Sequence, residues 1–262
     1  MATNNDVGIV DCEIKGAHAA LTIRNPARRN AITLAMWKQV SDLVGQADDD
    51  PSVHLITLRG HAGTFVSGAD ISEFSENRAD VDRAKAYEAF NGAAFSALRE
   101  SKTPTLALIE GFCFGGGVGL AAACDLRLAS STAKFAVPAA KLGLAYPVEG
   151  VRDLVRLIGP GATKKLFFTA DPISADVALR IGFVEDVVEA NAFAEAADSL
   201  IATILSRAPL TQRAAKSAIA ATSNPGLEEH AKRDADACFA SEDYAEGWQA
   251  FLDKRKPTFT GR

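Results

Sequence analysis

Three consecutive glycines at residues 115–117 lie between a β-type run, 105–110, and an alanine-rich segment that predicts a helix. Glycine has no Cβ, so a ligand can approach the backbone closely at such a position. The first N–H groups of the following helix have no partner within the helix and point outward. We therefore expect these N–H groups to face a ligand that carries or develops negative charge.

Three kinds of chemistry use this arrangement. A dinucleotide site has only the relaxed pattern Gly117-x-Gly119-x-x-Ala122 in its favour, and residues 137–142 lack the acidic residue that would bind the ribose. A phosphate-binding loop needs Gly-Lys-Ser/Thr after the glycines, and the chain has none there. The third chemistry is an oxyanion hole made of two backbone N–H groups. A nicotinamide-dependent oxidoreductase and a purely structural role for the glycines stay open as alternatives.

A second glycine-containing loop favours the oxyanion hole. Residues 60–71 follow the β-type run 53–59, just as the glycine triplet follows the run 105–110. Loops at the same ends of neighbouring parallel strands lie at one edge of a sheet. We therefore expect one N–H group from each loop to point at the same oxygen.

The elements that position these loops predict an α/β fold. The runs 53–59 and 105–110 are apolar through most of their length, which is typical of central strands covered on both faces. Further β-type runs lie at 8–14, 19–23, 125–129 and 182–188. Helical spacing occurs at 33–47, with Thr33 as the N-cap, at 80–100 and at 150–157, and then at 191–206, 210–222, 227–239 and 244–254. Residues 1–190 are expected to form an α/β core with the site, and residues 191–262 a helical region.

Composition excludes several classes of protein. The 262 residues carry 28 Lys and Arg against 33 Asp and Glu, and this net charge of −5 argues against nucleic-acid binding. No apolar run is long enough to span a membrane, and the N-terminal residues do not resemble a signal peptide, so we expect a cytoplasmic protein. The 4 cysteines have no metal-binding or C-x-x-C spacing, and we interpret them as core residues.

Several segments resemble the enoyl-CoA hydratase/isomerase (crotonase) family. They are Phe-Val-Ser-Gly-Ala-Asp-Ile at 65–71, the glycine-rich stretch 104–125, Leu-Phe-Phe-Thr-Ala-Asp-Pro-Ile-Ser-Ala at 166–175, and the ending at 241–259. The resemblance covers residues 23–259, nearly the whole chain. It implies a spiral core of repeated strand–strand–helix units and a C-terminal helical region used for trimerisation. It also implies an enzyme of fatty acid metabolism that acts on acyl-CoA thioesters, as a homotrimer or a dimer of trimers.

The resemblance also assigns site residues. The N–H groups of Ala69 and Gly116 would hold the thioester oxygen as it becomes an enolate. Lys254 would reach the CoA phosphates, including those of a neighbouring subunit. No metal or redox cofactor is implied, because CoA enters as part of the substrate. The residues along the CoA path would be Ser67, Asp70 and Ile71, with Ala27 and Arg28 nearby.

The chain departs from the family pattern at two catalytic positions. Where hydratases of the family carry two glutamates, this sequence has Gly119 and Ala139, which makes it a divergent member. Hydration needs one group to deprotonate water and one to protonate the α-carbon, and neither Gly nor Ala can do this. In the loop 141–153 we expect Glu149 to carry the proton and Tyr146 to donate a hydrogen bond. Glu149 as a simple helix N-terminal carboxylate and Tyr146 as a packing residue stay open.

Three hypotheses follow for the activity. The first is isomerase-like or other single-base chemistry on an acyl-CoA. The second is a decarboxylase similar to methylmalonyl-CoA decarboxylase, although that branch has a His where this chain has Ala69. The third is a non-catalytic acyl-CoA-binding protein. Residues considered for the acyl pocket are Phe74, Phe114 and Trp37.

Overall fold

Two parallel strands of buried residues form the centre of the computed structural model, which describes residues 8–262. β3 (Leu55–Gly60) pairs with β4 (Thr105–Ile109), with Ile56 opposite Thr105. The strand order β1-β2-β3-β4-β6-β9 confirms both as central strands of one sheet. Within this sheet, as the described residues form it, only the pair of β1 and β2 is antiparallel. The other four strands are β1 (Ile9–Lys15), β2 (His18–Arg24), β6 (Leu126–Ser130) and β9 (Asp186–Val188).

A second, three-stranded sheet lies beneath the first. Its strands are β5 (Phe112–Phe114), β7 (Lys134–Ala136) and β8 (Ile173–Ser174). β5 follows β4 and leads into α4 (Gly116–Ala123), while β7 follows β6 and leads into α5 (Ala139–Leu142). These are the strand–strand–helix units expected of the spiral α/β core.

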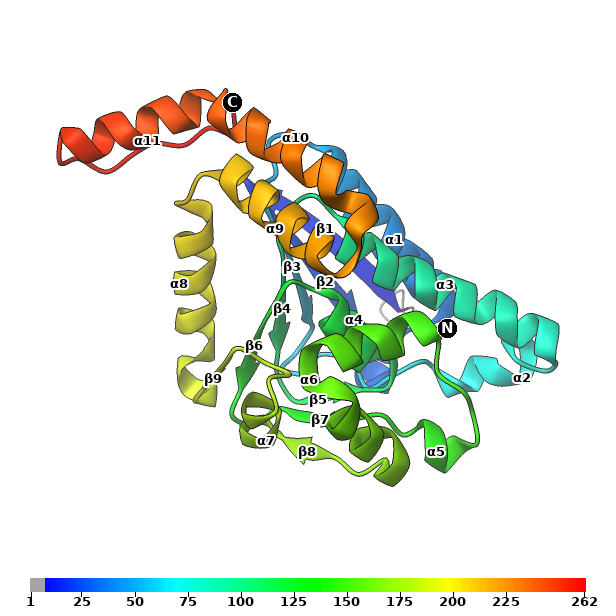
Figure 1. The fold of residues 1–262 in the computed structure, drawn as a ribbon. Helices are drawn as coiled ribbons and strands as arrows, with labels where there is room; N and C mark the ends of the chain where they lie inside the picture. Colours follow the sequence, from blue (N-terminus) through cyan, green and yellow to red (C-terminus); the bar gives the residue numbers. More distant parts are fainter. Residues whose placement is uncertain (1–7) are drawn as a thin grey trace, which may run out of the picture.

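Helices cover both faces of the large sheet (Figure 1). α1 (Leu34–Asp49) and α3 (Val81–Glu100) lie on one face. The Thr33 side chain accepts a hydrogen bond from Met36 N at 3.3 Å, so the predicted N-cap of α1 is confirmed. On the other face, α8 (Phe193–Leu205) packs Phe193 and Ala197 onto the sheet, so the C-terminal helical region begins in contact with the α/β core.

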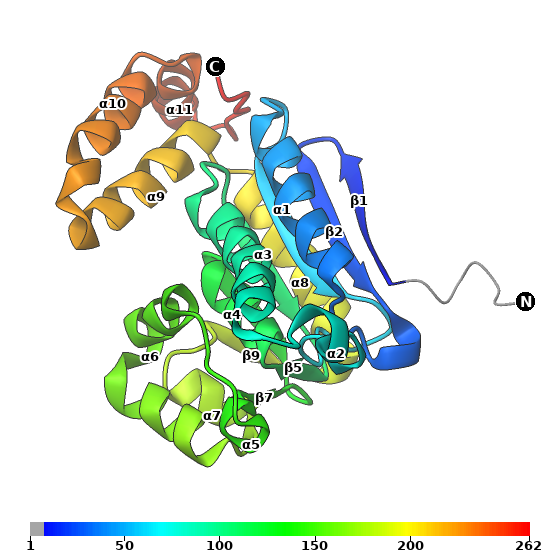
Figure 2. The ribbon, with the colours of Figure 1, turned by 90° about the vertical axis from the view of Figure 1, so that its right-hand side faces the viewer.

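The remaining helices extend from opposite ends of the sheet (Figure 2). One end carries α9 (Pro209–Ser223), α10 (Glu228–Phe239) and α11 (Glu242–Leu252), as the sequence predicts. The other carries α2 (Phe74–Asn77), α5 and α7 (Ala175–Arg180). α6 (Val148–Thr169) lies between the two groups, and its first turns line a cavity together with α9. The single-turn helices are η1 (Pro26–Arg28), η2 (Ile71–Glu73), η3 (Ala190–Ala192) and η4 (Pro225–Leu227).

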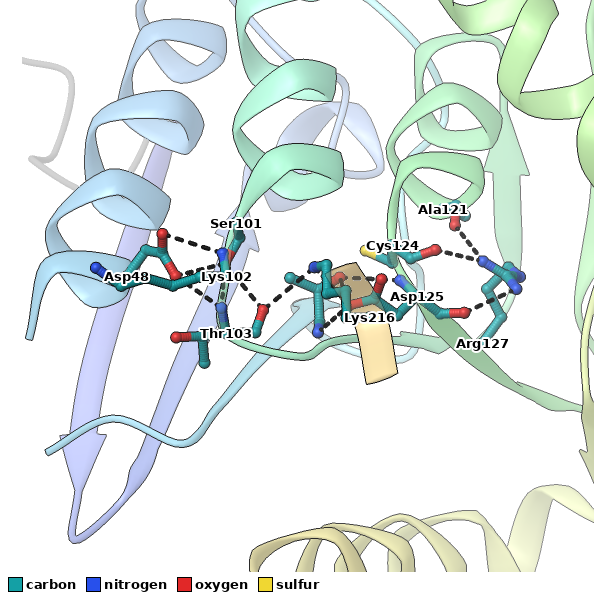
Figure 3. A network of polar contacts seen from close by, with 10 residues as sticks. Asp48, Ser101, Lys102, Thr103, Ala121, Cys124, Asp125, Arg127 and Lys216 are labelled. Carbon is teal, nitrogen blue, oxygen red and sulfur yellow. Dashed lines mark hydrogen bonds and ion pairs between the residues drawn. The ribbon is translucent and has the colours of Figure 1, made fainter. Parts of the chain in front are cut away.

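A buried arginine fixes the C-terminal end of α4 (Figure 3). Arg127 is 2% exposed, and its guanidinium donates to Cys124 O at 2.6 Å and to Ala121 O at 3.2 Å. The Asp125 carboxylate accepts from Thr105 N at 2.8 Å and from Lys216 Nζ at 2.7 Å. A cation at a helix C-terminus satisfies carbonyls that have no partner within the helix. The opposite end of α4, where Gly116 lies, is thereby held in a fixed place.

Two further findings concern the whole described region. None of the helices within residues 8–262 combines the length and the apolar character that a membrane span needs. Across the same residues, no three His, Cys, Asp or Glu side chains gather into a metal-binding group.

Candidate functional site

Backbone hydrogen bonds hold the two glycine loops against each other. Val66 N donates to Phe112 O at 2.8 Å, and Phe114 N donates to Val66 O at 2.8 Å. The loop after β3 therefore runs parallel to β5 for one residue, through the bridge between Val66 and Cys113. The predicted convergence of loops from two neighbouring parallel strands follows directly from this pairing.

In each loop, the residue before the candidate donor is a glycine at positive φ. Gly68 has φ of +118° and Gly115 has φ of +50°. Residues with a Cβ rarely adopt these angles, so both turns depend on glycine. The glycines also touch, since a methyl group added to Gly115 would lie 3.8 Å from Gly68 Cα.

Two backbone N–H groups remain free at this contact. Within residues 8–262, neither Ala69 N nor Gly116 N donates a hydrogen bond. Gly116 is the first residue of α4, where the helix cannot supply a partner. Asp70 N donates to Ile32 O at 2.8 Å and Ile32 N to Gly68 O at 2.9 Å, which fixes the backbone on both sides of Ala69. Each of the two loops thus presents one backbone N–H group without a partner among residues 8–262.

Both donors line a cavity of about 420 Å³. Its wall is mostly apolar and includes Ala31, Phe74, Phe95, Val137, Leu142 and Leu144. Among the residues expected from the sequence, Arg28, Ser67, Ala69, Asp70, Ile71, Phe74, Gly116 and Tyr146 line it. Ala27, Phe114, Trp37, Glu149 and Lys254 do not. Trp37 instead packs behind Gly116, where an added methyl group would lie 2.7 Å from its ring.

An ion pair forms one rim of the cavity. Arg28 Nη1 lies 3.0 Å from Asp70 Oδ1, and Ser67 Oγ donates to Arg28 O at 3.1 Å. Asp70 also accepts from Ser72 N at 3.0 Å and so caps η2. Ala27 lies beside this group in η1 and is exposed.

Glu149 and Lys254 lie outside the cavity wall. Glu149 is exposed in the first turn of α6 and lines an adjoining groove that shares Phe74, Arg78 and Glu88 with the cavity. The helix predicted at 150–157 is therefore the first part of α6, which bends at Gly159. Lys254 is exposed just after α11.

Tyr146 supports one of the glycine turns. Its hydroxyl donates to Gly115 O at 2.9 Å, and its ring packs edge-on against Phe167 with centroids 5.3 Å apart. Burial raises the pKa of the Tyr146 phenol far above its usual value, so the group stays protonated and can keep donating. This contact holds the carbonyl of the residue that precedes the Gly116 donor.

The space beside Gly119 is already filled. A methyl group added there would lie 2.3 Å from Phe95 Cζ and 2.7 Å from the Tyr146 hydroxyl oxygen. Ala139, in contrast, is 7% exposed and lines the cavity. A side chain at position 119 would therefore have to displace the buried Phe95 ring and the half-buried Tyr146.

Substitution of Gly119 tests this packing. We expect Gly119→Ala to lower the free energy of unfolding by about 1–3 kcal/mol, because overpacking forces buried rings off their preferred rotamers. The matched control is Gly92→Ala in α3, where an added methyl group meets nothing within 4 Å. That change should stabilise the helix by up to about 1 kcal/mol. Urea unfolding of both variants gives the two values, and equal stabilities would contradict the close contact.

Four polar residues in the cavity wall were not found from the sequence. They are Arg78, which follows α2, Glu88 and Asn91 of α3, and Lys141 of α5. Burial raises the pKa of the Glu88 carboxyl, and the Arg78 guanidinium opposes that shift. The spacing of residues 88, 91 and 95 places them on one helix face, and this was the signal available in the sequence.

Known proteins resemble this chain over nearly its whole length. A family model described as enoyl-CoA hydratase/isomerase matches residues 13–262. The crotonyl-CoA hydratase of Syntrophomonas wolfei subsp. wolfei is 37% identical over 252 residues, 93% of this chain and 95% of the relative. The short-chain-enoyl-CoA hydratase of Clostridium acetobutylicum is 35% identical over 249 residues, 93% of this chain and 94% of the relative.

Solved structures agree over nearly the whole length. An enoyl-CoA hydratase/carnithine racemase from Magnetospirillum magneticum superposes with a TM-score of 0.93 at 34% identity, covering 97% of this chain and 96% of the other. A putative enoyl-CoA hydratase/isomerase family protein from Hyphomonas neptunium has a TM-score of 0.91 at 39% identity, covering 97% and 98%. These similarities confirm the α/β fold class expected from the sequence.

Proposed function

The chain belongs to the enoyl-CoA hydratase/isomerase family, and we propose that it stabilises the enolate of an acyl-CoA thioester with the N–H groups of Ala69 and Gly116. One observation carries this proposal: two free N–H groups from loops far apart in the sequence line one cavity. An enolate places its negative charge on the thioester oxygen. Donors fixed at that oxygen lower the free energy of the transition state more than that of the bound substrate.

The CoA part of the substrate would pass along the Arg28 rim. Ser67, Asp70 and Ile71 line the cavity there, with Ala27 beside them. Lys254 lies apart from this rim, which fits a role at the CoA phosphates of a neighbouring subunit in a trimer. Large exposed apolar side chains on the C-terminal helices support such an assembly: Phe239, Trp248, Phe251 and Leu252.

Single-carboxylate chemistry fits the catalytic positions best. Gly119 and Ala139 cannot move protons, and the space beside Gly119 is taken by Phe95 and Tyr146. Shifting a double bond from the 3- to the 2-position needs one base, which removes an α-proton to give the dienolate and returns a proton to the γ-carbon. We propose Glu149 for this role, acting from the groove that adjoins the cavity. A general base can also act through one intervening water.

Hydration is the second candidate, because the named relatives above are hydratases. Two substrates distinguish isomerisation from hydration. A single-carboxylate isomerase converts a 3-enoyl-CoA to the 2-enoyl-CoA and adds no water to crotonyl-CoA. Formation of 3-hydroxybutanoyl-CoA from crotonyl-CoA would overturn the single-carboxylate proposal and leave the oxyanion hole in place.

The oxyanion hole itself is tested independently of the reaction. Binding of hexanoyl-CoA labelled with ¹³C at the carbonyl should shift the thioester infrared band to lower frequency, because two hydrogen bonds weaken the C=O bond. In D₂O the same complex should exchange its α-protons, which proton NMR detects. An unshifted band would overturn the proposal. A shifted band without exchange, and without decarboxylation of methylmalonyl-CoA, would favour a non-catalytic acyl-CoA-binding protein.

A further inference from the structure

A second cavity, of about 500 Å³, lies between α9 and the first turns of α6. Among residues 8–262, it shares no lining residue with the cavity of the two free N–H groups, which we call the acyl-CoA cavity. α4 joins the two: its first residue, Gly116, lines the acyl-CoA cavity, and its last residues, Ala122 and Ala123, line the second cavity. Pockets that hold a whole small ligand measure about 300–1,000 Å³. The second cavity is therefore a separate candidate binding site.

Most of the wall of the second cavity is apolar. Its aliphatic side chains come from four helices and strands on its different sides: Leu55, Leu126, Leu157, Ile204 and Ile219. Ile219 of α9 is 70% exposed, although the cavity lies beside it. An aliphatic chain in the cavity would remove such apolar surface from water, and this burial favours binding.

The same wall holds three cations but only two carboxylates. Arg99 Nη1 lies 2.6 Å from Asp153 Oδ2, and Lys216 Nζ lies 2.7 Å from Asp125 Oδ2 (Figure 3). The third cation is Arg156 of α6, whose side chain makes no ion pair or hydrogen bond within residues 8–262. Arg156 is also exposed, so a ligand can reach it. The cavity wall thus carries one net positive charge, and it lies at an accessible guanidinium.

Further basic residues lie on the other side of Arg156. It also lines a neighbouring pocket of about 480 Å³, together with Arg152 and Arg213. In the described part of the chain neither of these two arginines forms an ion pair, and the carboxylates of that pocket, Glu100 and Asp234, are paired with other basic side chains. Arg152 and Arg156 are four residues apart on α6, a spacing at which like charges destabilise a helix. An anion at Arg156 would offset that repulsion.

We propose that the second cavity binds a free fatty acid, with its carboxylate at Arg156 and its aliphatic chain along the apolar wall. A guanidinium can bind a carboxylate through two parallel hydrogen bonds. The single net charge matches a monoanion better than a dianionic phosphate ester. Within residues 8–262 no aromatic side chain lines the cavity, so none there would stack on a nucleotide base. This site is separate from the proposed acyl-CoA chemistry and does not depend on it.

Calorimetric titration of the hexanoyl-CoA-saturated protein with sodium octanoate tests this inference. We expect octanoate to bind while the acyl-CoA cavity is occupied. Hexanoate should bind roughly 15-fold more weakly, because it buries two methylene groups fewer. 1-Octanol should bind at least about 10-fold more weakly than octanoate, because it lacks the charge that pairs with Arg156.

Three variants locate the site. Arg156→Gln should weaken octanoate binding at least about 10-fold and leave hexanoyl-CoA binding unchanged. Ala215→Phe, at an exposed position of α9, should fill part of the second cavity and weaken octanoate binding without a change of charge. The matched control is Arg180→Gln, an exposed arginine of α7 that lines neither cavity, and it should leave both affinities unchanged.

Each contrary outcome has a separate meaning. Absence of octanoate binding would overturn the inference, as would equal affinities for octanoate and 1-octanol. Competition between octanoate and hexanoyl-CoA, or undiminished binding by Arg156→Gln, would overturn it in favour of the acyl-CoA cavity. Tighter binding of octyl phosphate would overturn it in favour of a phosphate head group. Failure of hexanoyl-CoA to bind would count against the proposed function alone. If a variant fails to fold, the comparison of ligands on the unaltered protein still decides.

Discussion

Replacement of Ala69 by proline lowers the rate of α-proton exchange by about 10²–10³-fold. Proline has no backbone N–H, and its Cδ would occupy the position from which the donor hydrogen points into the cavity. The local fold does not use that hydrogen, because the neighbouring backbone bonds are made by Gly68 O and Asp70 N. The loss should therefore appear in catalysis and in the thioester infrared band rather than in stability.

The matched control for this change is Ala69→Gly, which keeps the N–H. Its exchange rate should stay within a few-fold of the unaltered protein, and its carbonyl band should remain shifted. Thermal unfolding of both variants checks that the loop after β3 is intact. A proline variant that folds, exchanges protons at the original rate and keeps the shifted band would contradict Ala69 N–H as an oxyanion donor.

The sequence predicted the large sheet well because its central strands carry strong local signals. The apolar runs at 53–59 and 105–110 correspond to β3 and β4, and the run 125–129 to β6. The short strands of the second sheet were missed, since two or three residues cannot display an alternating pattern. The run 182–188 was too long, because Gly182 has φ of +79° in a turn and only Asp186–Val188 pairs with β6.

The part of the candidate site that glycines form was predicted from the sequence. The part formed by side chains that meet only in the folded chain was missed. Gly68 and Gly115 mark the two turns in the sequence itself. Arg78, Glu88 and Asn91 were missed because helix 80–100 shows its apolar spacing first. The spacing of residues 88, 91 and 95 places them on one helix face, but it does not indicate that this face borders a cavity. That cavity exists only after α3 packs beside the segment 142–147. The filled space beside Gly119 likewise needs Phe95 and Tyr146 from elsewhere in the chain.

The C-terminal helices also show that local sequence signals predict an element but not its contacts. Three helices were predicted from spacing and from breaks at Pro209 and Pro225, at residues 210–222, 227–239 and 244–254. They are confirmed as α9, α10 and α11. The sequence could not predict which faces of these helices are covered. Trp248 and Phe251 are apolar, yet they remain exposed in the single chain. Exposed aromatic residues of this kind are what the proposed trimer would cover.

Replacement of Glu149 by glutamine should lower the exchange and isomerisation rates by about 10²–10⁴-fold if this carboxylate moves the proton. An amide has nearly the same shape and cannot accept a proton, so the change isolates the chemistry. Glu149 is exposed in the first turn of α6, and no side-chain hydrogen bond or ion pair within residues 8–262 involves it, so little structure is lost. Loss of its charge near the α6 N-terminus should cost only about 0.3–1 kcal/mol of stability.

Two further variants separate catalysis by Glu149 from its role in the helix. Glu149→Asp keeps the charge near the helix N-terminus and should retain part of the activity, whereas a purely structural carboxylate would leave the rate of Glu149→Gln unchanged. Glu88→Gln should leave α-proton exchange of hexanoyl-CoA within a few-fold, since Glu88 lies about 10 Å from Phe95 along α3. If Glu88→Gln abolished exchange while Glu149→Gln did not, the proton carrier would be the carboxylate inside the cavity. Glu149 would then only stabilise the N-terminus of α6.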